Sequence, residues 1–261
     1  MVIDKEVVLN NIVSLLKDRP EIHAAWEGGS QATGFVDEFS DIDLCVVADA
    51  PIQGVIERVQ RMLEEKFGVS HTWQTAKSGW GEGIAQRVIV LKNAPEFFSV
   101  DLGVMDRAVP QAYGMFLEVE RHGTPRILFD KGGILHERHA DAAEIFARQT
   151  VRAEELRQGF PIFKSLTLKE LRRGHPIDAI SFYQNGLVRP LVEVMAMNYR
   201  PYRWDFGLRY LHRDFPEAEQ KLIQELSYVA DVADLPAKVA RAEAEFLKAI
   251  AVFKGKRSLE G

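Results

Sequence analysis

Two aspartates at the start of an apolar segment constrain this chain more than any other feature. Residues 41–48 run Asp-Ile-Asp-Leu-Cys-Val-Val-Ala, and their β-branched and apolar side chains, without helical spacing, predict a strand. Because side chains alternate between the two faces of a strand, Asp41 and Asp43 point to one face, and Ile42 and Leu44 point to the other. Two carboxylates on one face repel each other unless a cation lies between them, and Mg2+ prefers such oxygen ligands. The alternative is a solvated acidic strand end that holds no metal.

A glycine-rich turn lies shortly before these aspartates. Gly28-Gly29-Ser30 follows an apolar stretch, Ile22 to Trp26, that predicts a short strand. Glycine lets the backbone turn tightly, and turns of this kind present N–H groups that suit phosphate oxygens. The hydroxyl of Ser30 either caps a helical turn or reaches a ligand. The turn and the two aspartates together favour a site for metal and phosphate over the solvated alternative.

A third aspartate, Asp101, lies in another apolar segment, residues 97–105. A carboxylate in an apolar strand is expensive to bury unless another group pairs with it. If this strand lies beside residues 41–48, Asp101 joins Asp41 and Asp43 around one or two cations, the arrangement that phosphoryl or nucleotidyl transfer requires. The alternative for Asp101 is a strand end that faces water.

These three segments resemble the motifs of the nucleotidyltransferase superfamily that DNA polymerase beta typifies. Within that superfamily the chain most resembles the aminoglycoside and lincosamide nucleotidyltransferases, also through residues 127–133 and through a catalytic domain followed by a helical domain. The resemblance implies that Mg2+ is bound at the catalytic aspartates and that the glycine turn holds nucleotide phosphates. For Asp101 it leaves two roles open, metal ligand and general base, because an aspartate reaches less far than the glutamate of some relatives. The residues concerned are Asp41, Asp43 and Asp101 for catalysis and metal, and Gly28, Gly29 and Ser30 for the nucleotide.

The order of the elements predicts an α/β (α+β) nucleotidyltransferase domain with a mixed sheet over residues 1–135, and an all-α helical bundle over residues 136–261, with the site between them. In the first domain the spacing predicts helices at 4–18 and 52–67, and strands at 22–27, 42–48, 69–75, 84–91, 97–105 and near 126–130. In the second, Pro161 predicts a break, Pro190 predicts a kink or an interruption, and helices are expected near 203–213, 217–231 and 235–254.

Three residues of the predicted helical domain are further candidates. By the resemblance, Arg203, which precedes Trp204 in a basic aromatic segment, contacts nucleotide phosphates. The alternative is a connection between helices whose aromatic side chains fill the core. Asp178 and Glu193 lie on a predicted helix over residues 177–198, and they would bind a cationic acceptor if they faced the site. Most carboxylates on helices are simply solvated, which is the alternative for both.

Composition limits the partners. The chain has 261 residues and a net charge of −5, so it lacks the basic excess expected of a protein whose main partner is a long nucleic acid. Its one cysteine, Cys45, excludes an internal disulfide and agrees with a cytoplasmic location. No signal sequence and no apolar run long enough to span a bilayer is present, so we expect no membrane partner.

We therefore expect a Mg2+-dependent nucleotidyltransferase that moves AMP from ATP to a hydroxyl of a small acceptor. An aminoglycoside or lincosamide as acceptor would imply a role in antibiotic resistance, and a monomer and a homodimer are both open. One alternative acceptor is a protein side chain or a tRNA end, as in toxin–antitoxin relatives, although the acidic net charge disfavours tRNA. A non-catalytic nucleotide-binding module is a further alternative, which the three intact aspartates disfavour.

Overall fold

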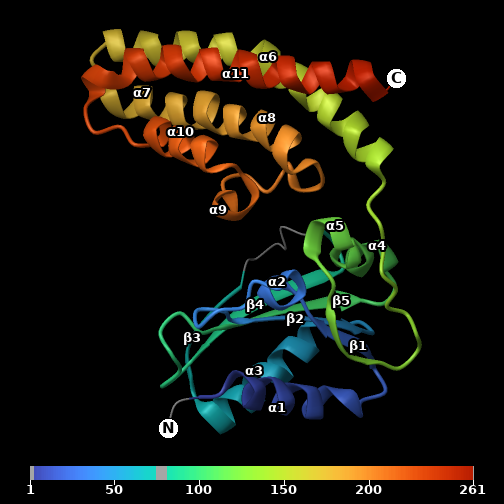
Figure 1. Ribbon diagram of the computed structural model, residues 1–261. Coiled ribbons are helices and arrows are strands. Elements are labelled where there is room, and N and C mark those ends of the chain that lie inside the picture. The colour runs from blue at the N-terminus through green and yellow to red at the C-terminus, as the bar shows by residue number, and fades with distance from the viewer. Residues whose placement is uncertain (1–2, 75–80, 261) are drawn as a thin grey trace. The chain divides into compact units, whose positions relative to one another are not determined.

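The computed structural model describes residues 3–74 and 81–260. The chain divides into two compact units, Met1–Ala140 and Asp141–Gly261 (Figure 1). We call these units the N-terminal domain and the C-terminal domain.

A mixed sheet forms the centre of the N-terminal domain. As far as the structure describes it, the sheet has six strands in the order β3-β4-β5-β2-β1-β6. Strands β2 and β5 are parallel, and the other neighbouring strands are antiparallel. The predicted mixed-sheet fold is thereby confirmed. The strands are β1 (Ile22–Glu27), β2 (Ile42–Ala48), β3 (Val69–Trp73), β4 (Ile84–Leu91), β5 (Val100–Asp106) and β6 (Arg126–Asp130).

Helices α1 (Lys5–Lys17) and α3 (Gln53–Phe67) cover one face of this sheet (Figure 1). Asp4 caps α1 by accepting a hydrogen bond from the Val7 N–H at 3.1 Å, which satisfies one of the unpaired donors of the first turn. The apolar stripes of both helices pack on alternate residues of the central strands, and this removes both from water. The cluster includes Val8, Leu9, Ile12, Leu16, Val55, Ile56, Val59, Leu63, Ile42, Leu44, Val46, Val100, Leu102 and Val104.

The opposite face carries only short elements among the described residues (Figure 1). They are α2 (Gly29–Thr33), α4 (Pro110–Gly114), η1 (Met115–Leu117) and α5 (Val119–His122). A smaller apolar cluster lies on this face and contains Ala24, Trp26, Val47, Ile84, Met105, Ala112, Tyr113 and Leu117. Asp43 and Asp101 belong to this face, since each is an even number of strand positions from Val47 or Met105.

Two strand boundaries differ from the prediction. The strand expected from residue 97 begins at Val100, because Phe97 has a φ of +72° and therefore cannot continue an extended strand. Strand β3 ends at Trp73, and residue 75, where the predicted strand ended, lies outside the described residues.

The C-terminal domain is helical, as predicted. Its core is built around the buried Tyr183, whose hydroxyl donates a hydrogen bond to the Leu226 carbonyl at 2.9 Å. In the part of the chain that the structure describes, no helix is both long enough and apolar enough to cross a membrane. The helices are α6 (Ala142–Arg172), α7 (Pro176–Tyr183), α8 (Arg189–Tyr199), α9 (Leu211–Asp214), α10 (Glu217–Ser227) and α11 (Leu235–Glu260), with 3-10 turns η3 (Pro201–Arg203) and η4 (Val232–Asp234).

The break predicted at Pro161 is wrong, because α6 continues through this proline. Proline in a helix interior removes a hydrogen bond and normally kinks or ends the helix. Here the residue before it, Phe160, is buried and stacks on Phe246 of α11 with ring centroids 4.1 Å apart. The tertiary packing of Phe160, next to the proline, therefore outweighs the local preference of the proline.

Two further differences concern the segment after α7. The interruption predicted at Pro190 takes the form of a π-helical turn, η2 (Gln184–Val188), from which α8 continues directly. The single helix expected over residues 203–213 is wrong, because the chain forms the 3-10 turn η3 and then the short α9. Gly207, with a φ of +61°, lies between them, in a conformation that ends right-handed helices.

Candidate active site

The parallel strands β2 and β5 bring Asp43 and Asp101 together. Their register pairs these two residues directly, so both carboxylates lie on the same face of the sheet in neighbouring strands. Both residues are partly exposed. The side-chain amide of Gln86, on β4, donates to the two oxygens of Asp101 at 2.7 and 2.8 Å, which fixes the orientation of that carboxylate.

The glycine turn contacts Asp43. The N–H of Gly28 donates to the carbonyl of Asp43 at 2.8 Å. Gly29 has a φ of +53°, and a Cβ atom on it would lie 1.6 Å from Oδ2 of Asp43. Only glycine satisfies both the left-handed conformation and the lack of space. The Asp43 carboxylate therefore packs directly against the turn that was predicted to hold phosphates.

Ser30 follows in the first turn of α2 with its hydroxyl oxygen buried. That oxygen has no hydrogen-bond partner within the described residues. Leaving a buried polar group without a partner costs about 1–3 kcal/mol, so such groups are rare in folded proteins. The arrangement is chemically suited to a ligand atom that the chain itself does not provide.

Asp41 lies just before β2, and its interactions differ from those of Asp43. Its carboxylate accepts a hydrogen bond from the Ser99 hydroxyl at 3.1 Å, and its carbonyl accepts one from the Lys5 ammonium at 2.6 Å. The three aspartates are less tightly gathered than Glu170, His175 and Asp178 of the C-terminal domain. Among the described residues, only that second group has three ligand atoms all within 4.8 Å of one another.

The cluster of Glu170, His175 and Asp178 closes the turn between α6 and α7. Glu170 accepts hydrogen bonds from Arg173 at 2.9 Å and from His175 at 2.8 Å. These two contacts, with that of His175 the larger, lower the pKa of Glu170 although its partial desolvation opposes them. The Glu170 carboxylate thus already accepts hydrogen bonds from two side chains of its own domain. Asp178, a predicted acceptor-binding residue, is exposed, as is His175, whereas Glu170 is buried.

The other two candidates of the C-terminal domain are paired within it. Arg203 donates to Asp214 at 2.6 Å, and Asp214, 4 % exposed, is also contacted by Arg200 and Arg213, each at 3.2 Å. Trp204 is buried, as the core interpretation of this segment expected. Glu193, predicted to bind an acceptor, accepts two hydrogen bonds from Arg152, at 2.8 and 3.2 Å.

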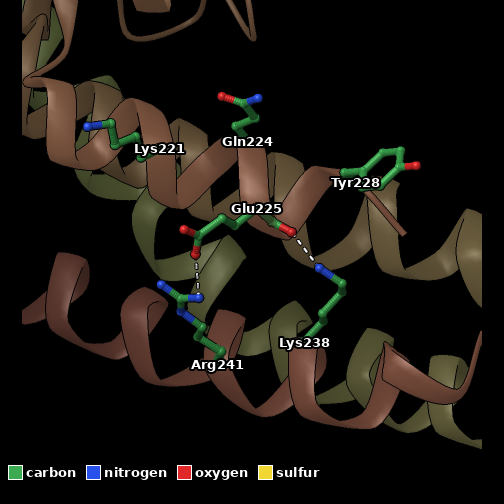
Figure 2. Close-up of a pocket in the computed structure, with 6 residues that line it drawn as sticks. All are labelled: Lys221, Gln224, Glu225, Tyr228, Lys238 and Arg241. Atoms are coloured by element: carbon green, nitrogen blue, oxygen red, sulfur yellow. Dashed lines mark hydrogen bonds and ion pairs between the residues drawn. The ribbon is translucent and has the colours of Figure 1, made fainter. Parts of the chain in front are cut away.

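A pocket of about 560 Å3 lies elsewhere in the C-terminal domain (Figure 2). In Figure 2, Glu225 of α10 faces Arg241 and Lys238 of α11. Arg241 contacts the Glu225 carboxylate at 2.6 Å, and Lys238 donates to the Glu225 carbonyl. These contacts link the two helices, and none of the predicted site residues lines the pocket. The lining side chains are Lys221, Gln224, Glu225, Tyr228, Lys238 and Arg241.

The pKa of the Cys45 thiol is affected by the charges of the candidate site. It lies two positions after Asp43 on the same face of β2. Burial raises the pKa of its thiol, and the negative charges of Asp43 and Asp101 raise it further. The thiol is therefore protonated at neutral pH, and its pKa depends in part on the negative charges of the two aspartates.

Several residues around the aspartates were missed by sequence reasoning. Gln86 lies in β4 and Ser99 directly precedes β5, and neither position indicates a role in the site until the strand pairing is known. Glu27 is completely buried and pairs with Lys5 at 3.0 Å and with Arg126 at 3.3 Å. Its signal was available, since a charged residue ends an apolar strand immediately before Gly28.

A protein-family model matches the part of the chain that contains the glycine turn. Residues 9–73 match the family model described as a nucleotidyltransferase domain. The matched segment runs from α1 to the end of β3 and contains the glycine turn, Asp41 and Asp43. The match confirms the predicted resemblance to nucleotidyltransferases and the predicted enzyme class. No curated protein matches the chain.

Solved structures with a similar arrangement include nucleotidyltransferases of low sequence identity. The aminoglycoside 6-adenyltransferase from Bacillus subtilis is 14 % identical with a TM-score of 0.38, over 98 % of this chain and 92 % of that chain. A nucleotidyltransferase-like protein from Exiguobacterium sibiricum is 13 % identical with a TM-score of 0.40, over 98 % and 79 %. The spectinomycin adenyltransferase from Enterococcus faecialis, solved with ATP and spectinomycin, is 10 % identical with a TM-score of 0.35, over 96 % and 100 %. Similarity at this level does not identify a substrate.

Proposed function

We propose that the chain catalyses the Mg2+-dependent transfer of AMP from ATP to a hydroxyl of a small acceptor, with release of pyrophosphate. The observation that carries this proposal is the contact between Gly29 and Asp43. It joins the turn suited to phosphate with the carboxylate pair formed by Asp43 and Asp101. A phosphate-binding turn and a metal-binding carboxylate pair in contact are the two parts that nucleotidyl transfer needs.

Nucleotide phosphates would be held by Gly28, Gly29 and Ser30. The Gly28 N–H is already bonded to the Asp43 carbonyl, so Gly28 would shape the turn, and the backbone N–H groups of Gly29 and Ser30 would donate to phosphate oxygens. The buried Ser30 hydroxyl, which lacks a protein partner among the described residues, would donate to one of these oxygens. This pairing would satisfy the hydroxyl and orient the phosphate chain beside Asp43.

The donor set fits Mg2+. Asp41, Asp43 and Asp101 offer carboxylate oxygens from one face of the sheet, and this ion prefers such ligands together with substrate phosphates and water. The adjacent charges of Asp43 and Asp101 repel each other in the absence of a cation, which favours binding. When bound, the ion supplies charge stabilisation on the phosphate oxygens during transfer.

The chain's own residues would position the reactants and accept a proton. An acceptor hydroxyl oxygen forms a bond to the α-phosphorus, and the bond from this phosphorus to the pyrophosphate oxygen breaks. The hydroxyl proton passes to a base, for which we propose Asp101, since Gln86 holds both of its oxygens in place. Orientation and charge stabilisation supply most of the rate enhancement in such transfers.

In the C-terminal domain, we propose a role for one arginine and one aspartate. Arg203 would contact nucleotide phosphates from the ion cluster around Asp214. For a cationic acceptor, Asp178 is the better candidate, because it is exposed, whereas Glu193 is already bound by two nitrogens of Arg152. The acceptor class, an aminoglycoside or a lincosamide, comes from the resemblance to that branch of nucleotidyltransferases.

The test is pyrophosphate release from nucleoside triphosphates with Mg2+ and a panel of aminoglycosides, lincosamides, protein acceptors and tRNA. We expect release that depends on both Mg2+ and a small acceptor, and a loss of about 10³-fold in Asp43→Asn, since metal-ion charge stabilisation contributes several kcal/mol. The matched control is Asp49→Asn, at the exposed position directly after the same strand, where the side chain pairs with His23.

Three results would contradict the proposal in different ways. Unchanged turnover in Asp43→Asn would remove the proposed chemistry. Turnover with only a protein or tRNA acceptor would keep the chemistry and replace the acceptor. Nucleotide binding without turnover on any acceptor would favour a non-catalytic module.

A further inference from the structure

We propose that Lys5 is a positioning residue for this site, because a buried ion pair lets it hold the Asp41–Asp43 segment against the glycine turn. The inference rests on the proposed function of Asp41 and Asp43. It assigns a role to the first turn of α1, which lies outside the motifs that the sequence indicated.

The ammonium of Lys5 contacts two segments that converge on the site. It lies 3.0 Å from Oε1 of Glu27 and donates to the carbonyl of Asp41 at 2.6 Å. Glu27 ends β1 directly before Gly28, and Asp41 directly precedes β2. One cation therefore joins the residue that leads into the phosphate turn to the residue that begins the aspartate pair.

The burial of Glu27 makes this contact obligatory. Glu27 is 0 % exposed, and a buried carboxylate is tolerated only when cations or donors surround it. Arg126 of β6 lies 3.3 Å from its second oxygen and is held in turn by Glu6 at 2.7 Å. Lys5 and Glu6 are neighbours on α1, so this helix supplies both ends of the network.

The other end of β1 offers an internal comparison. There, Arg58 of α3 pairs with Glu21 at 2.7 Å, and both side chains are about one-third exposed. That pair also joins a helix to β1, but it lies at the end of the strand opposite to the glycine turn. If ion pairs of this kind only stabilise the domain, removing either pair should have the same kind of effect.

The variants are chosen so that no buried charge is left alone. Lys5→Met combined with Glu27→Gln removes the ion pair and the tether to Asp41, while Arg126 keeps its partner Glu6. Arg58→Met combined with Glu21→Gln is the matched control, and Lys5→Arg is the conservative variant that retains a cationic donor. All are made in the full chain, and unfolding temperatures are measured for each.

The readouts are Mn2+ binding, measured by electron paramagnetic resonance of the free ion, and the separate kcat and KM values of pyrophosphate release. Loss of residues that orient metal ligands typically lowers metal affinity or activity by about 10–100-fold. We therefore expect the Lys5/Glu27 variant to bind Mn2+ about tenfold more weakly and to lose kcat with little change in the acceptor KM. The Arg58/Glu21 variant should retain both its Mn2+ affinity and its kcat, even if its unfolding temperature falls as far as that of the Lys5/Glu27 variant. Lys5→Arg should retain most of the Mn2+ binding.

Two outcomes would overturn the inference. If wild-type protein binds Mn2+ in a manner that Asp43→Asn abolishes, and the Lys5/Glu27 variant binds it equally well, Lys5 has no positioning role and the proposed function survives. If Asp43→Asn leaves wild-type Mn2+ binding and turnover unchanged, the proposed function fails and the role of Lys5 fails with it.

Discussion

The two faces of the N-terminal sheet are formed by alternate residues of the same strands, yet they carry different kinds of side chain. On β2, Ile42 and Leu44 face α1 and α3 and are 0 % and 1 % exposed. Asp43 and Cys45, the residues between and after them, lie on the other face and are partly exposed. The comparison shows that one strand can serve stability through one face and chemistry through the other, because its side-chain period is two.

Strand β5 repeats the same division. Leu102 and Val104 are completely buried in the large apolar cluster, whereas Asp101 and Gly103 lie on the face with Asp43 and Cys45. The large cluster under α1 and α3 holds the strands in register. That register in turn pairs Asp43 with Asp101, so the placement of the charges depends on packing on the opposite face.

The largest effect of a single substitution should be a loss of stability, caused by a change on the apolar face of the sheet. Leu44→Ala removes a buried side chain from the large cluster and should lower the free energy of unfolding by about 2–5 kcal/mol. Urea denaturation measures this loss. Because Leu44 does not face the aspartates, the specific activity of the folded protein should stay near that of wild type. A loss of activity larger than the loss of folded protein would mean that the two faces are not separable.

The next largest effect should come from the face that carries the aspartates, and there we expect the rate of pyrophosphate release to change more than the stability. Gly29→Ala places a methyl group where Oδ2 of Asp43 now lies, and on a backbone with a φ of +53°. The carboxylate must move, and displacement of a catalytic group by about 1 Å can lower the rate by about 10²-fold. Pyrophosphate release and the unfolding temperature are measured together, with Gly54→Ala, where an added Cβ meets nothing within 4 Å, as the control. Equal activity in the two variants would contradict the contact between the turn and Asp43.

The smallest effect should be a change in the alkylation rate of Cys45. This measurement tests the negative charge of the site and needs no acceptor substrate. Its raised pKa predicts that alkylation by iodoacetamide at neutral pH is slow in the folded protein and becomes fast in urea. Asp43→Asn removes one of the two charges that raise the pKa and should accelerate alkylation, but by less than unfolding does, since burial is the larger cause. Mass spectrometry of the alkylated fraction over time measures both. Fast alkylation of folded wild type would contradict the placement of this thiol.

Much of the sheet and part of the site were accessible to sequence reasoning, because both depend on short-range patterns. The alternation in residues 41–48 correctly placed Asp43 away from the core, and the apolar spacing correctly located α1 and α3. The pairing of Asp43 with Asp101 could be stated only as a condition, since a parallel pair joins residues that are distant in the chain. Gln86 and Ser99 could not be identified at all, because their roles exist only once β4 and β5 lie beside the aspartates.

In the C-terminal domain, one local sequence signal was misleading because tertiary packing overrode it. Pro161 and Pro190 are strong local signals; the first predicted a break in a helix and the second a kink or an interruption. At Pro161 the helix continues, with Phe160 stacked on a residue 86 positions away in sequence, Phe246. Near Pro190 a π-helical turn absorbs the disturbance. Local propensity is worth about 3 kcal/mol for a proline, and burial of an aromatic side chain can offset a penalty of that size.

The sequence by itself determined which residues alternate, which glycines permit a tight turn and which charges lie at the ends of apolar strands, since these follow from backbone periodicity and side-chain size. Only the tertiary structure decided that Gly29 touches Asp43, that Lys5 reaches both Glu27 and Asp41, and that α6 passes through its proline. These contacts join segments far apart in the chain. Their free energy comes from burial and charge pairing, which exist only after the strands and helices have packed.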